Sequence, residues 1–444
     1  MRPRTATVLL FGGLILSGSR GAVAQRQAEP PVPQPTKARS AEPPSLPGYT
    51  LAPEERGRAR SYSRARYRLH FIGFAWSVIV LLGFLASRAA PRLRDLAEQR
   101  SRKRFVHFLF VLVPLGALQA LLELPIGVSR QRLAQDYGLS VQSWTSWLAD
   151  WLKEGAIALA IGIPVIWLVY AAIRRSPRRW WLAVGLASIP VTIALVFLAP
   201  LVLDPLFFRF EKLEQSRPAL VSQIETLTRR AGLEIPRDRI FEMNASAKRR
   251  SVNAYVTGFG RSKRVVIWDT TLQKMTPEET LHVFGHEMGH FVLRHVWKGI
   301  LLSCLLLTAL LYGVHRTAEW IVEHRGARWD IRSVADFASL PLLALLLAVF
   351  AELALPLSNA YSRRVEHDAD IFALEATYGV VPDARRVAVA SFQKLGEINL
   401  SDPAPSPFIR MWLYSHPPIA ERIAFAAAYD PWSSGEKPRF IPRP

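Results

Sequence analysis

The sequence predicts a mainly α, polytopic transmembrane helical bundle that carries a domain outside the membrane with a small β-hairpin or sheet. Half of the 444 residues are hydrophobic, although the net charge is +20. Six apolar runs are each about long enough to cross a bilayer as a helix. After the fourth and the sixth run, the chain shows the amphipathic and alternating patterns of helices and strands that are exposed to water.

Residues 1–24 have the pattern of a secretory signal peptide. Arg2 and Arg4 precede a mainly apolar core from Ala6 to Leu16, and Ala22-Val23-Ala24 matches a cleavage site of small residues. A core of this length can hardly span a bilayer. We therefore favour cleavage, with an uncleaved, short first span as the alternative.

Residues 25–66 are predicted to be a linker. Eight prolines fall between Pro30 and Pro53 among polar residues. Such a segment cannot bury enough apolar area to fold, so we expect it to be extended.

The membrane part is predicted from four apolar runs in residues 67–203 and two in residues 299–357. Trp and Tyr side chains lie near the ends of several runs, as they do at membrane interfaces. We interpret Glu123 and Glu352 as carboxylates at the interface or facing the bundle; the alternative is that they line an internal cavity. The six runs are Leu69–Ser87, Phe105–Leu124, Ala156–Ile173, Trp180–Leu203, Ile300–Val322 and Ala338–Leu357.

The basic residues lie beside the apolar runs, which excludes a nucleic-acid-binding surface and favours contact with membrane lipid. Residues 88–104 carry seven Lys or Arg and residues 174–179 carry four, whereas residues 125–154 carry three. The positive-inside rule places the first two loops in the cytoplasm. The predicted signal peptide favours a bacterial export context, so we expect a bacterial inner membrane with residues 204–298 facing the periplasm. The single Cys304 provides no disulfide framework.

Residues 204–298 are predicted to be the first half of a catalytic domain. Residues 212–232 have the spacing of an amphipathic helix, and residues 251–269 alternate like two strands joined near Gly258. An edge strand can bind an extended peptide through its backbone. We expect Asn253, Ala254 and Tyr255 to bind substrate in this way; the alternative is a structural hairpin that packs on the following helix.

The segment His286-Glu287-Met288-Gly289-His290 matches the H-E-x-x-H pattern. On a helix, His286 and His290 share one face and can bind one zinc ion, which keeps a coordination position for water. Glu287 lies beside that position and can take a proton from the water. The segment Thr276-Pro277-Glu278-Glu279 predicts the start of this helix. These features indicate a zincin-type catalytic domain.

A third ligand is available in residues 358–435, the second half of this domain. Glu366 and Asp370 lie four residues apart and share a helical face. Glu366 could complete the zinc site, and Asp370 could accept a hydrogen bond from a ligand histidine. The two runs between His290 and Glu366 return the chain to the side of the membrane where the histidines lie. His282 and His295 are interpreted as surface or packing residues. His367 is left out of the site, because on a helix it points about 100° away from its neighbour Glu366.

The order of these motifs resembles the CAAX prenyl protease 1 family of integral membrane zinc metalloproteases. The resemblance rests on HEMGH, on SRRVEHDAD at residues 362–370, on YSHPPIAER at residues 414–422, and on NAYVTGFG and KRVVIWDT before the zinc helix. It implies one zinc ion per chain, bound by His286, His290 and Glu366, with Glu287 as the general base and Asp370 as the acid that supports a ligand. It further implies that His416 and Arg422 stabilise the tetrahedral intermediate or hold the substrate backbone.

These observations predict a membrane-embedded zinc metalloendopeptidase that cleaves peptides or proteins, some of them lipidated or bound to the membrane. The resemblance implies CAAX-box processing most directly, whereas the predicted signal peptide favours maturation or quality control of membrane proteins. Relatives in eukaryotes work on the cytosolic side, in contrast to the orientation given by the loop charges. The alternative function is a non-enzymatic transporter or scaffold. The tail, residues 436–444, is expected to be disordered.

Overall fold

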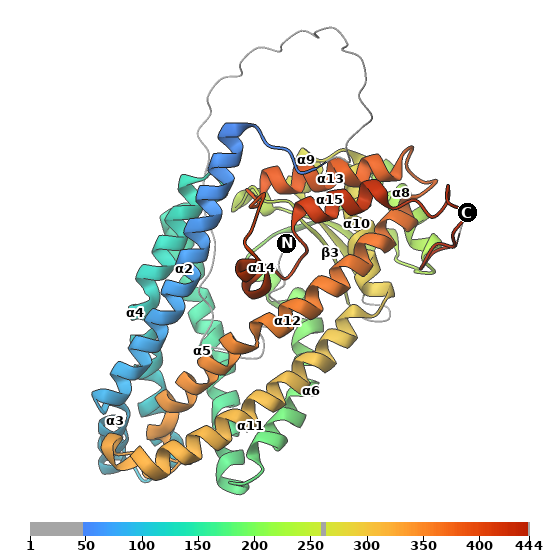
Figure 1. The fold of residues 1–444 in the computed structure, drawn as a ribbon. Helices are drawn as coiled ribbons and strands as arrows, with labels where there is room; N and C mark the ends of the chain where they lie inside the picture. Colours follow the sequence, from blue (N-terminus) through green and yellow to red (C-terminus); the bar gives the residue numbers. More distant parts are fainter. Residues whose placement is uncertain (1–47, 259–262, 443–444) are drawn as a thin grey trace.

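The computed structural model describes residues 48–258 and 263–442, which form a bundle of long helices with a smaller domain at one end (Figure 1). The signal peptide predicted at residues 1–24 and the linker predicted for residues 25–47 lie outside the described part. The prediction that the linker extends to residue 66 is wrong, because helix α2 (Pro53–Ala86) begins at Pro53. Proline in the first turn, followed by Glu54 and Glu55, favours a helix start at this point.

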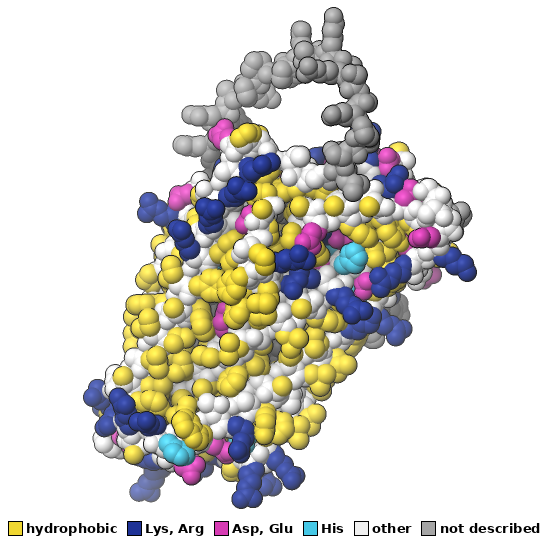
Figure 2. All heavy atoms as spheres, viewed as in Figure 1, with side chains coloured by type: hydrophobic (Ala, Val, Ile, Leu, Met, Phe, Trp, Pro, Cys, Tyr) yellow, Lys and Arg dark blue, Asp and Glu magenta, His cyan; other side chains and the backbone are white. Residues whose placement is uncertain are grey.

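Six helices of the described residues are long and apolar enough to cross a membrane, and each contains one of the predicted runs, except for Ser87 at the end of the first run. Many of their large apolar side chains are exposed, and Figure 2 shows a broad belt of apolar side chains on one face of the bundle. This belt fits the hydrocarbon layer of a bilayer. The six helices are α2, α4 (Arg104–Asp136), α5 (Trp144–Arg175), α6 (Trp180–Val202), α11 (His295–Trp329) and α12 (Leu340–Thr377).

Two carboxylates inside the belt tie helices together. Glu123 of α4 accepts a hydrogen bond from Ser77 of α2, at 2.9 Å. Glu352 of α12 lies 2.9 Å from Nε2 of His70 on α2 and accepts a hydrogen bond from Trp412 at 2.8 Å. Both side chains therefore face the bundle, as we interpreted them from the sequence.

At the end of the bundle away from the smaller domain, the buried Arg94 of α3 (Ala89–Arg100) connects neighbouring segments. Its guanidinium donates to the carboxylates of Asp330 and Asp336, in the loop between α11 and α12. The basic loops of residues 88–104 and 174–179 lie at this same end (Figure 1).

The smaller domain contains a four-stranded sheet within the described residues, in the order β1-β2-β4-β3. Strands β2 and β4 are parallel, and the other two pairs are antiparallel. Strand β4 is buried along its whole length, and β3 forms an edge. The pair predicted within residues 251–269 corresponds to β3 and β4. The strands are β1 (Phe210–Lys212), β2 (Ile240–Met243), β3 (Ala254–Thr257) and β4 (Arg264–Trp268).

Helices cover this sheet and surround a core that the last half of α12 enters from the membrane side (Figure 1). Phe284 of α10, Phe372 of α12 and Phe392 of α13 are fully buried in this core. The covering helices are α7 (Leu213–Ser216), α8 (Pro218–Arg230), α9 (Asp269–Lys274), α10 (Pro277–Val292), α13 (Ala384–Ile398) and α15 (Ile419–Ala428), and α14 (Pro407–Leu413) lies between α2 and α12.

The tail is ordered up to residue 442, so the prediction of a disordered segment from Glu436 is wrong for this part. The buried carboxylate of Glu375 on α12 accepts the backbone N–H groups of residues 439–441, at 2.5 to 2.8 Å. It also accepts a hydrogen bond from the hydroxyl of Tyr429. A buried carboxylate needs several donors, and the tail provides them here.

Candidate active site

The zinc motif lies on α10, whose first turn is fixed by a capping box. The hydroxyl of Thr276 accepts the backbone N–H of Glu279 at 3.2 Å, and the Glu279 carboxylate accepts the backbone N–H of Thr276 at 2.8 Å. Gly289 lets the helix approach α12, because a Cβ atom there would lie 3.0 Å from the Cβ of Phe372. His286 and His290 lie on the face of α10 that points towards α12.

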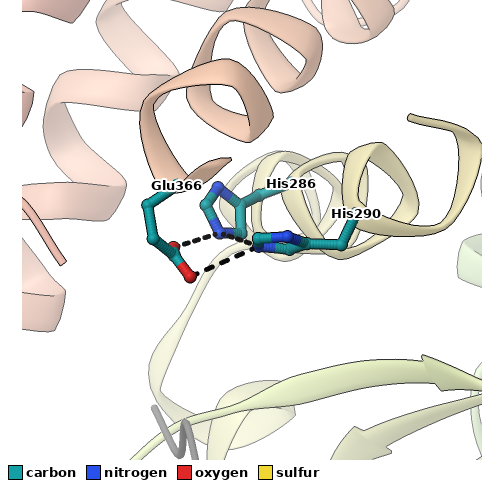
Figure 3. A group of neighbouring side chains, drawn as sticks. All are labelled: His286, His290 and Glu366. Carbon is teal, nitrogen blue, oxygen red and sulfur yellow. Dashed lines mark hydrogen bonds and ion pairs between the residues drawn. The ribbon is translucent and has the colours of Figure 1, made fainter. Parts of the chain in front are cut away.

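Helix α12 brings Glu366 to the two histidines, as the sequence predicts. One ligand atom from each of the three side chains lies within 4.8 Å of the others. Nε2 of His286 is 3.1 Å from Glu366 Oε2, and Nε2 of His290 is 3.5 Å from Glu366 Oε1. Figure 3 shows the two imidazoles extending from one helix towards the carboxylate on the other.

Asp370 fixes the orientation of His286. Its Oδ1 atom lies 2.8 Å from Nδ1 of His286. A carboxylate can only accept here, so Nδ1 carries the hydrogen and Nε2 presents its lone pair to the cluster. Arg422 of α15 holds Asp370 from the other side through Nε at 2.8 Å and Nη2 at 2.5 Å. Burial opposes the charge on Arg422, but Asp370 and Glu366 outweigh it and raise the pKa of this guanidinium.

His416 lies directly against the cluster. Its Nε2 atom is 3.0 Å from Glu366 Oε2, and its Nδ1 atom is 2.9 Å from the hydroxyl of Ser415. Burial lowers the pKa of His416, although the charge of Glu366 opposes this effect. Together, α10, α12 and the segment before α15 bring six of the predicted residues into one continuous set of contacts: His286, His290, Glu366, Asp370, His416 and Arg422.

Glu287 and the predicted substrate strand lie beside this set. Glu287 follows His286 on α10 and is partly exposed, as a group that exchanges protons with a substrate must be. Asn253 precedes the edge strand β3, and its backbone is already bonded: its N–H donates to Thr271 and its carbonyl accepts from Trp268. Ala254 is buried, and the hydroxyl of Tyr255 donates to Asp204. The N–H and the carbonyl of Asn253 are therefore already bonded within the domain, and β3 after it forms an edge of the sheet.

His295 belongs to the site surroundings and was not predicted to do so. Its Nδ1 atom lies 3.2 Å from Nδ1 of His290, and its side chain is buried. Arg294 before it has a left-handed backbone, with φ of 56°, which ends α10 and turns α11 away. Because the helix is interrupted at this residue, the helical spacing of α10 does not predict where the side chain of His295 lies. His282 packs against Phe392, in agreement with our interpretation. His367 lies outside the cluster and packs against Phe425.

A stripe of polar residues on α12 holds the segment that carries His416. The stripe runs along one face at spacings of seven, four, three and four residues, which a helix brings into line. Asn359 donates to the carbonyl of Trp412 at 2.6 Å, and Arg363 donates to the carbonyl of Tyr414 at 2.6 Å. The stripe consists of Glu352, Asn359, Arg363, Glu366 and Asp370, each with a partner in residues 410–422.

The donor set of this cluster fits a divalent transition metal. Two imidazole nitrogens and a carboxylate oxygen from two rigid helices point at one another, and the lone pair of His286 is turned inwards by Asp370. Two histidines and one glutamate are a ligand set of catalytic zinc sites. His286, His290 and Glu366 could therefore hold such an ion.

Two family models match the chain. The model of peptidase family M48 matches residues 214–430, which include the whole cluster. The model described as the CAAX prenyl protease N-terminal part, with five membrane helices, matches residues 34–209. The described part of this second range contains helices α2 to α6, four of them candidate spans.

Individual proteins match over most of the chain. An uncharacterized metalloprotease of Bacillus subtilis, YhfN, is 33% identical over 395 residues, which cover 89% of this chain and 90% of that protein. CAAX prenyl protease 1 of Saccharomyces cerevisiae is 26% identical and covers 82% of this chain and 84% of its own length. The crystal structure of S. mikatae Ste24p has the same fold, with a TM-score of 0.74 at 23% identity, covering 87% of this chain and 92% of that chain.

Proposed function

The chain belongs to peptidase family M48, and from this premise we propose that it is a zinc endopeptidase whose catalytic residues are those of the cluster between α10 and α12. That it is a multi-span membrane metalloprotease of the CAAX prenyl protease type follows from the family. The single observation that carries the assignment of residues is the convergence of His286, His290 and Glu366 within 4.8 Å.

Each residue has a chemical task in this proposal. Bound zinc would polarise the scissile carbonyl as a Lewis acid. Glu287 accepts a proton from the attacking water and delivers it to the leaving amine. Asp370 keeps His286 in the tautomer that presents Nε2, and Arg422 holds Asp370 in place. His416, beside the Glu366 carboxylate, donates to the oxyanion that develops on the substrate.

The substrate is a peptide or protein. We propose that it reaches the site from the membrane and lies along the exposed part of β3 in an extended conformation. Glu366 lies in the last half of α12, which enters the smaller domain from the membrane side, so a segment at the bilayer surface would be within reach of the cluster (Figure 1). CAAX-type lipidated tails and segments of membrane proteins awaiting maturation or quality control both have this location.

We further propose that the protein lies in a bacterial inner membrane with the site in the periplasm. The support is loop charge, because both strongly basic loops lie at the end opposite the site. The rival function, a transporter or scaffold, has no support in the peptidase family. Labelling of single cysteines placed in residues 176–179 and 401–406 would test the orientation; labelling of the first group from outside intact cells would refute it.

The experiment for the catalytic proposal compares purified wild type with Glu287→Gln and His286→Ala. We expect wild type to hold one zinc ion and to cleave peptides until a chelator removes it. Glu287→Gln should retain zinc but lose activity by a factor of 100 or more, since a general base contributes about 10²–10⁴. His286→Ala should lose both. Activity in Glu287→Gln that equals wild type would refute the assignment.

A further inference from the structure

Behind the segment that carries His416, a basic pocket of about 300 Å³ lies between α12, α14 and α15. Arg363 and Arg364 of α12 and Arg410 of α14 line it. A second, smaller hollow adjoins it, since Arg363 and Arg410 line both. Asp370 and Arg422 of the proposed active site also line it, whereas Arg364 and Arg410 have no task in the proposed proteolysis.

The positive charges of this pocket are only partly balanced. Four guanidinium groups and two carboxylates line it. Arg422 is paired with Asp370, and Arg410 is paired with Glu421. The remaining two guanidinium groups, of Arg363 and Arg364, form no ion pair within the described residues.

These two charges belong to neighbouring residues of α12. Arg363 donates to the carbonyls of Arg410 and Tyr414, which carry no formal charge, and it interacts with a carboxylate only through the more distant Glu421. Arg364 is exposed and makes no hydrogen bond or ion pair in the part of the chain that the structure describes. An anionic group in the pocket would supply the missing charge.

The pocket lies where the apolar belt ends. Leu353 and Leu357 of α12 are 60% and 59% exposed, as lipid-facing side chains are. Arg364 lies on the same face, because eleven residues make three helical turns. Phe408 and Met411 of α14, beside the second hollow, are also exposed. Figure 2 shows Lys and Arg side chains gathered over this part of α12, directly above the belt.

A polar group that binds here would therefore have an apolar surface immediately beneath it. This is the arrangement of a phospholipid, whose phosphate lies at the interface and whose acyl chains lie along the helices. We propose that the pocket binds the phosphate of an anionic phospholipid headgroup, with the acyl chains on the face of Leu353 and Leu357. Guanidinium groups suit this ligand because they bind phosphate oxygens in pairs.

The test measures lipid binding directly, so it does not depend on proteolytic activity. Full-length protein in a neutral detergent is titrated with phosphatidylglycerol, phosphatidylcholine or inorganic phosphate, and native mass spectrometry counts the bound molecules. The variant pair is Arg364→Gln with Arg410→Gln. The matched control is Arg64→Gln with Arg68→Gln, two exposed arginines of α2 that precede the first apolar run.

We expect wild type to prefer phosphatidylglycerol to phosphatidylcholine. The Arg364/Arg410 pair should weaken phosphatidylglycerol binding roughly thirtyfold, since each interfacial arginine contributes about 1 kcal/mol. The control pair should change it less than threefold. If the Arg364/Arg410 pair does not fold, judged by thermal unfolding, Arg364→Gln alone should weaken binding about fivefold.

Three outcomes would overturn the proposal. Equal binding of both lipids by wild type would mean that the pocket does not select charge. An equal loss in the control pair would mean that basic residues anywhere at the interface act alike. Inorganic phosphate that binds as tightly as phosphatidylglycerol, and competes with it, would make this a site for free phosphate.

Discussion

Replacing Asp370 by Asn should damage metal binding and stability at once, and by amounts that the contacts allow us to work out. The Asp370 carboxylate accepts from His286 at 2.8 Å, so its loss removes the group that fixes the tautomer of a ligand. Such substitutions typically weaken metal binding by about 10–100-fold. The side chains of Arg422 and Asp370 are 2% and 1% exposed. An unpaired buried charge left behind costs about 3–5 kcal/mol.

The matched control is Asp368→Asn, two residues away on the same helix. Asp368 pairs with Arg439, whose side chain is 52% exposed, so its replacement should cost at most about 1 kcal/mol and leave zinc affinity unchanged. Zinc affinity is measured by competition with a chromophoric chelator, and the free energy of unfolding by titration with SDS in mixed micelles.

A second variant separates the two effects of Asp370→Asn. Asp370→Asn with Arg422→Met removes the unpaired charge, so it should recover much of the stability while zinc affinity stays low. If Asp370→Asn matched Asp368→Asn in zinc affinity within threefold, Asp370 would not orient His286, and the proposed division of tasks would be wrong.

Three further changes test other parts of the structure. Asn359→Ala removes a hydrogen bond to the segment of His416 and should lower kcat about fivefold without changing zinc affinity; an equal loss of zinc would contradict this. Glu375→Gln leaves backbone donors of the tail without an acceptor and should cost about 2–3 kcal/mol in the free energy of unfolding, whereas an unchanged value would show that the tail is not held there. Burial lowers the pKa of His282 to about 3 in the folded chain, whereas the same side chain has a pKa of about 6.5 in the unfolded chain. Below pH 6.5 the unfolded chain therefore binds one more proton at this position, and the free energy of unfolding falls. Between pH 8 and pH 5 this proton lowers the free energy of unfolding by about 2 kcal/mol, and His282→Leu should abolish that decrease while changing the value at pH 8 little. Measurements of unfolding at both pH values check this.

The parts of the fold that the sequence predicts are those governed by periodicity. Hydrophobic runs long enough for a bilayer identify the six spans, and spacing within a helix places His286 beside His290 and Glu366 beside Asp370. Two spans separate His290 from Glu366, and an even number of crossings requires both pairs of residues to lie on the same side of the membrane. All of these inferences follow from local spacing along the chain, without knowledge of any tertiary contact.

What periodicity cannot predict depends on single residues or on distant partners. The turn at Arg294 brings His295 back to His290, although the two lie five positions apart and on different helices. Strands β1 and β2 have three and four residues, too few to show an alternating pattern. The tail looks like a disordered segment until Glu375, more than sixty residues earlier, is seen to accept its backbone.

Helix α12 is continuous from the bilayer to the metal ligands, and this makes the catalytic geometry sensitive to membrane thickness. Glu366 lies 13 residues beyond Leu353, or roughly 20 Å along the axis. A bilayer that is too thin or too thick tilts a spanning helix. A tilt of α12 by a few degrees would move Glu366 by about an ångström relative to α10, the scale on which ligand geometry is lost. The acyl-chain length of the host membrane would then set the turnover rate, even for a substrate that never contacts lipid.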